Sequence, residues 1–90
     1  MNNPHSLLGA LAMDLDRVSL GYYRGSKKMA EVFAREALKR KDELQSAIVK
    51  PYIRKLLKNL ESVLSEKDHK KLAEDALMYS TLFQNAALRE

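Results

Sequence analysis

Apolar residues recur at helical spacing in four stretches of the chain, and no stretch alternates apolar and polar residues as a strand does. The clearest stretch is residues 51–64, where apolar positions lie one, three or four apart, opposite a charged face. Pro51 and Gly25 fall between stretches and act as breaks. The pattern predicts helices at residues 4–23, 26–49, 51–64 and 66–88.

Three of the predicted helices have recognisable start signals. Asn3 can cap the first helix, with Pro4 at the first helical position, where a missing N–H costs nothing. Ser26 can cap the second, and the run from Ser65 to Asp68 matches a capping box for the fourth. These signals support the predicted starts of helices one, two and four.

Short connections between helices favour antiparallel neighbours, so we expect an all-α fold, a small four-helix up-down bundle formed by residues 1–90 as a single domain. Pro51 leaves an alternative open, because a proline in a first helical turn and a proline at a kink look alike in sequence. Helices two and three could therefore be joined through a kink at Pro51. The expected core includes, on helix three, Leu56, Leu57, Leu60 and Val63.

The composition fits a small folded domain, with 46% hydrophobic and 31% charged residues in a chain of 90. The absence of cysteine excludes disulfides, thiolate zinc sites and cysteine nucleophiles, and fits a cytoplasmic location. The longest apolar run, residues 7–13, is far shorter than the roughly 20 residues that cross a bilayer. We therefore expect no membrane partner.

The same apolar run suggests self-association. Residues 7–13 are apolar all round the predicted helix, which is more than one core-facing stripe needs. A chain this short also buries a modest share of its surface, which makes association useful for stability. The sequence thus predicts a homodimer, and the candidate self-association surface consists of Leu7, Leu8, Leu11 and Ala12.

Positive charge is concentrated in residues 1–60, which carry twelve basic and six acidic side chains, whereas residues 61–90 carry four and six. No acidic residue lies between Lys50 and Glu61, so this segment is the best candidate basic patch. Such a patch could bind nucleic acid or an acidic partner. Its candidate residues are Lys50, Arg54, Lys55 and Lys58, joined by Arg24, Lys27 and Lys28.

Catalytic and cofactor signals are weak. Glu66 and His69 have the Glu-x-x-His spacing of dimetal bundles, but such sites need two pairs and the chain has one. The segment from Gly21 to Lys27 lacks the Walker spacing and is better explained as a turn. We therefore expect no catalytic residue, no metal and no cofactor, and an enzyme is the least favoured class.

Three function classes remain in order of preference. The first is a helical interaction module that associates with itself and binds another macromolecule. The second is a nucleic-acid-associated protein that uses the basic patch on helix three. The third is a carboxylate-dependent metal enzyme. Fold alone does not separate them, because helical bundles host all three roles.

Overall fold

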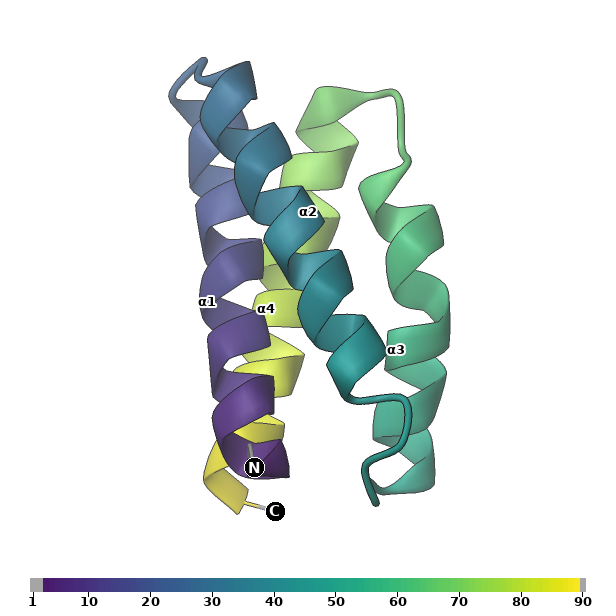
Figure 1. The fold of residues 1–90 in the computed structure, drawn as a ribbon. Coiled ribbons are helices and arrows are strands. Elements are labelled where there is room, and N and C mark those ends of the chain that lie inside the picture. The colour runs from purple at the N-terminus through teal and green to yellow at the C-terminus, as the bar shows by residue number, and fades with distance from the viewer. Residues whose placement is uncertain (1–2, 90) are drawn as a thin grey trace.

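The computed structural model describes residues 3–89, which form four α-helices and no strand (Figure 1). The helices run up and down in turn, as expected of an all-α up-down bundle. Both chain ends lie at the same end of the bundle as the connection between the second and third helices (Figure 1). The helices are α1 (Pro4–Tyr23), α2 (Lys27–Glu43), α3 (Pro51–Leu64) and α4 (His69–Arg89).

The helix starts follow local capping chemistry. The Asn3 side chain accepts a hydrogen bond from the His5 N–H at 2.7 Å, and Ser26 accepts one from the Met29 N–H at 3.4 Å. Helix α4 starts at residue 69 and not at 66, because the Asp68 carboxylate accepts the N–H groups of Lys70 and Lys71 at its first turn. Ser65 instead donates to the Glu61 carbonyl at the end of α3.

Helix α2 ends at Glu43, six residues before the predicted end, and residues 44–50 lie outside any helix. Arg54 explains the early end. Its guanidinium donates to the carbonyl oxygens of Leu44 and Ala47, at 3.1 and 2.6 Å, and so satisfies acceptors beyond the last turn of α2. The two helices are separate, and the alternative of one rod kinked at Pro51 is wrong.

The core is organised around α1, which packs against both α2 and α4, while α3 closes the bundle against α2 and α4. Ile53, Leu57 and Leu60 of α3 are fully buried in the main cluster, and Leu56 and Val63 are partly buried beside it. Leu57 and Leu60 therefore confirm the predicted facing of α3. The largest fully buried side chain is Phe83 of α4.

Helices α1 and α2 approach closely at one glycine. A Cβ atom added at Gly21 would lie 2.8 Å from the backbone nitrogen of Ala30, closer than non-bonded atoms come. The turn that follows contains Gly25 at φ +77°, a backbone conformation that favours glycine. The tight connection between these helices thus depends on two glycines for two different reasons.

We predict that Gly21→Ala destabilises the fold by about 1–3 kcal/mol, as overpacking a tight contact does. The obstructing atoms belong to the backbone of Ala30, so no side-chain rotation relieves them. The matched control is Gly9→Ala, whose added Cβ would meet the nearest atom at an ordinary 3.9 Å. Urea denaturation measures both free energies, and equal values for the two variants would contradict the role assigned to Gly21.

Candidate functional site

The predicted self-association surface is buried within the chain itself. Leu7, Leu8, Leu11 and Ala12 are between 0 and 6% exposed and belong to the main core cluster. They are apolar all round the helix because α1 has neighbours on both sides, α2 and α4. The prediction that these four residues form an exposed interface is therefore corrected. They hold the bundle together and leave no surface free for a second copy.

A different apolar surface is exposed, on the C-terminal half of α4. Residues 76–88 contain no charged side chain, in a chain that is 31% charged. Leu77 is 45% exposed, although its spacing from the buried residues of α4 would place it on the buried side of the helix. The exposed large apolar side chains of this half, which we call the α4 face, are Leu77, Met78, Leu82 and Leu88.

The α4 face continues across a groove to α1. Met13 of α1 is 52% exposed on the opposite wall of this groove, which has a volume of about 310 Å³. Beneath it, the buried Ser80 hydroxyl donates to the Ala12 carbonyl at 2.6 Å and fixes the two helices together. The walls combine apolar and uncharged polar groups with one acidic and one basic residue: Ala12, Met13, Asp16, Arg17, Leu77, Ser80, Thr81, Gln84 and Asn85.

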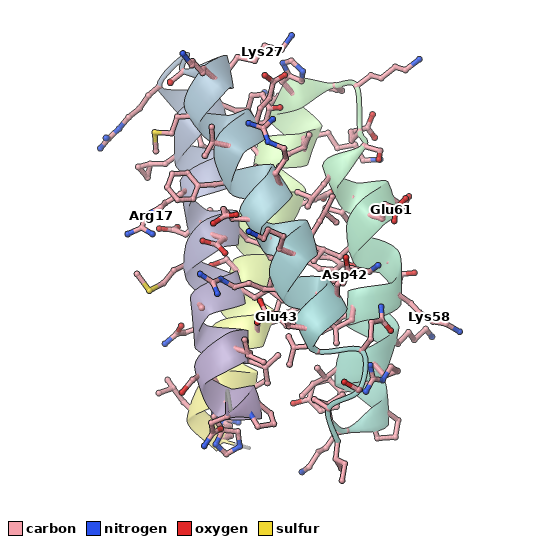
Figure 2. The ribbon with its side chains drawn as sticks, in the orientation of Figure 1. Arg17, Lys27, Asp42, Glu43, Lys58 and Glu61 are labelled. Carbon is pink, nitrogen blue, oxygen red and sulfur yellow. The ribbon has the colours of Figure 1, made fainter. Side chains whose placement is uncertain are left out.

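The seven residues of the predicted basic patch do not form one surface. Arg24, Lys27 and Lys28 lie at the connection from α1 to α2, whereas Lys50 and its neighbours lie where α3 begins, at the other end of the bundle (Figure 1). Figure 2 shows Lys27 at the end of the bundle where α2 begins, whereas Lys58 lies farther along the bundle, on α3. The prediction that Arg24, Lys27 and Lys28 join the patch on α3 is therefore wrong, because the two groups lie at opposite ends of the bundle.

Within the α3 part of the patch, the basic residues have unequal roles. Arg54 holds the two carbonyl oxygens of the connection from α2 and is a structural residue. Lys55 and Lys58 are exposed, and we call them the α3 row. On the next turn, Glu61 lies 4.0 Å from Lys41 of α2, so the acidic residue that follows the row is engaged with another cation.

An ion pair between a buried carboxylate and a partly exposed guanidinium connects α1 with α2, and the sequence pattern did not reveal it. The Arg40 Nε donates to Asp14 Oδ2 at 2.8 Å, and the Asp14 side chain is only 6% exposed. Burial raises the pKa of Asp14, although the hydrogen bond and charge of Arg40 oppose the rise. Asp14 lies three residues after Leu11, on the buried stripe of α1, and a carboxylate at such a position needs a partner.

Glu66 and His69, which have the Glu-x-x-His spacing, make separate contacts with different partners. Glu66 lies 3.4 Å from the Lys71 Nζ and accepts the Asp68 N–H, and these bonds lower its pKa. His69 stacks on Tyr22 of α1, with ring centroids 4.5 Å apart and planes inclined by 32°. Among residues 3–89, no group of three or more His, Asp or Glu side chains is placed to hold a metal ion.

The Tyr22–His69 stack borders a recess of about 270 Å³ at the end of the bundle where α1 ends and α4 begins. Burial and then the charge of Glu31 raise the pKa of Tyr22. The sequence points to these aromatic residues separately, but their meeting depends on how α4 packs against α1. The walls of this recess, which we call the aromatic recess, are Tyr22, Tyr23, His69, Lys70 and Ala73.

No helix in the described part of the chain is long and apolar enough to cross a membrane. In comparisons with protein-family models, curated proteins and solved structures, nothing matches this chain. Its function is therefore inferred from the surfaces described above.

We predict that Arg40→Met lowers the free energy of unfolding by about 3 kcal/mol at neutral pH, because it leaves the Asp14 carboxylate buried without its partner. Asp14 has a folded-state pKa above its ordinary value of 3.8. The cost of its charge is therefore present above the folded pKa and disappears as the pH falls towards 3.8. The loss in Arg40→Met should shrink over the same range.

The double variant Asp14→Asn with Arg40→Met is the matched control, because it removes the titrating group from the same site. Chemical denaturation at a series of pH values measures both. A stability difference between the single and double variants that stays constant as the pH falls would contradict the assignment.

Proposed function

We propose that this chain is a cytoplasmic helical interaction module that associates with a second copy of itself through the α4 face. The observation that carries the proposal is the group of large apolar side chains exposed on the uncharged half of α4, with Met13 of α1 across the groove. Large apolar side chains grouped on one exposed part of a protein are more typical of interaction sites than apolar side chains scattered singly. By contrast, most of the exposed residues of α2 are charged.

The size of this side of the bundle is adequate for a dimer. The molecule measures 35 Å in length and 20–22 Å in width, so one long side offers about 700 Å². Stable interfaces of standard size bury about 600–1,000 Å² on each partner, so a dimer would use most of this side. Burial of Leu77, Met78, Leu82 and Leu88 would contribute most of the hydrophobic free energy.

The chemistry of the α4 face favours a second copy as the partner. In a two-fold symmetric dimer, the same surface meets itself, so a charged surface would repel its copy. The stretch from 76 to 88 has no charge and avoids this cost, although the whole chain carries a formal charge of +4. Gln84 and Asn85 have both donors and acceptors in their side chains and can pair with amides across such an interface.

Nucleic-acid binding along α3 is the alternative function. The exposed Lys55 and Lys58 of the α3 row support it, because cations on one helix face can neutralise backbone phosphates. Arg54 contributes less than its position suggests, since its guanidinium is committed to the α2–α3 connection. The metal-enzyme interpretation gains nothing, because Asp14 and Glu66 are both engaged with cations.

We predict that Met78→Glu converts a dimer into a monomer, as measured by light scattering during size-exclusion chromatography. Met78 is 52% exposed, so a charge at this position should leave the monomer fold intact, which circular dichroism checks. Val32→Glu on α2 is the matched control, because Val32 is 39% exposed and lies outside the α4 face. A wild-type protein that stays monomeric at every concentration would rule out the proposal.

We predict that, if the α3 row binds duplex DNA, Lys55→Glu with Lys58→Glu reduces the salt dependence of binding. Each lost phosphate contact lowers the slope of log affinity against log salt by about one. The control is Arg35→Glu with Lys39→Glu, which makes the same change of charge on α2. Fluorescence polarisation with a labelled duplex measures both, and equal slopes for the two double variants would argue against the α3 row.

A further inference from the structure

The aromatic recess combines rings from two helices that are far apart in sequence. Tyr22 and Tyr23 end α1, and His69 begins α4. The His69 ring lies against Tyr22 at a centroid distance of 4.5 Å, whereas Tyr23 is 60% exposed and no aromatic ring in the described residues stacks on it. The recess, of about 270 Å³, is thus bordered by one pair of aromatic rings in contact and by one exposed aromatic ring.

Lys70 of α4 is the basic residue in the wall of the recess. Arg24 follows the tyrosines directly in sequence, and Lys27 and Lys28 begin α2 after the turn, at the same end of the bundle. Figure 2 shows Lys27 extending from this end of the bundle.

Two acidic side chains at this end, Glu66 and Asp68, have partners within the chain. Glu66 pairs with Lys71, and the Asp68 carboxylate accepts the N–H groups of the first turn of α4. The helix N-terminus is therefore already satisfied by the chain itself and is not the proposed site. Glu31 is the acidic group that acts on the Tyr22 hydroxyl, and it should oppose an anion placed beside that ring.

We propose that the aromatic recess binds single-stranded nucleic acid, with one base stacked against Tyr23 and the adjoining phosphates held by Lys70 and by the cations of the α1–α2 turn. Single-strand sites combine aromatic stacking with a positive track for the backbone, and every base offers a ring face, so such binding is insensitive to sequence. A base inside a duplex has both faces covered by its neighbours, so this recess favours a single strand. The inference stands independently of self-association, which uses the other half of α4.

Fluorescence polarisation with a labelled thymidine oligonucleotide at low salt tests the inference. Tyr23→Leu should weaken binding about tenfold, the loss expected for one base stack. Tyr52→Leu is the matched control, because Tyr52 is 51% exposed on the first turn of α3 at the opposite end, and it should bind as the wild type does. Lys70→Glu should weaken binding and Glu31→Gln should strengthen it.

The two histidines of the chain give an independent measurement. His69 lies in the recess and His5 lies at the opposite end of the bundle, so titration with the same oligonucleotide should shift the imidazole NMR signals of His69 and leave those of His5 in place. Undetectable binding, equal losses in Tyr23→Leu and Tyr52→Leu, or an unmoved His69 signal would each overturn the proposal. Tighter binding of duplex DNA that depends on the α3 row would overturn it in favour of the alternative function.

Discussion

The structure depends above all on the burial of α1. This helix has neighbours on both sides and contributes Leu8, Leu11 and Leu15 to the fully buried core. Its close approach to α2 is possible because Gly21 leaves room for the backbone of Ala30. Since a short chain buries a limited share of its surface, concentrating that burial on one helix gives the bundle a well-packed centre. As a result, most of the large side chains of the apolar run at residues 7–13 are buried in the core and are not available for an interface.

The buried position of α1 also explains the Asp14–Arg40 pair. A carboxylate on the buried stripe loses much of its hydration, and the guanidinium of α2 restores part of that stabilisation through a 2.8 Å hydrogen bond. The geometry of this bond ties α2 to α1 at one position along the helix pair. Because the loss of hydration offsets much of the attraction, the pair adds little net stability, and we expect its main effect to be on the alignment of the two helices.

Most local features of the fold could be predicted from the sequence, although the start of α4 was placed three residues early, and features that depend on distant residues could not. Caps such as Asn3 and Ser26 act within a few residues, so the helix starts they mark are confirmed. The end of α2 depends on Arg54, which reaches back from the next helix. Periodicity also cannot tell how many neighbours a helix has. For this reason, the periodicity led us to predict an interface at the buried part of α1 and to miss the exposed α4 face.

Helix α4 divides the proposed roles between its two halves. Its first turn carries His69 and Lys70 in the wall of the aromatic recess, and its second half, from 76 to 88, is uncharged. Association through the uncharged half would leave the recess of each copy open. A strand long enough to reach both recesses would then bind the second at a high effective concentration, so that two weak single-base sites act as one stronger site. Self-association would in this way turn a shallow recess into a useful binding surface.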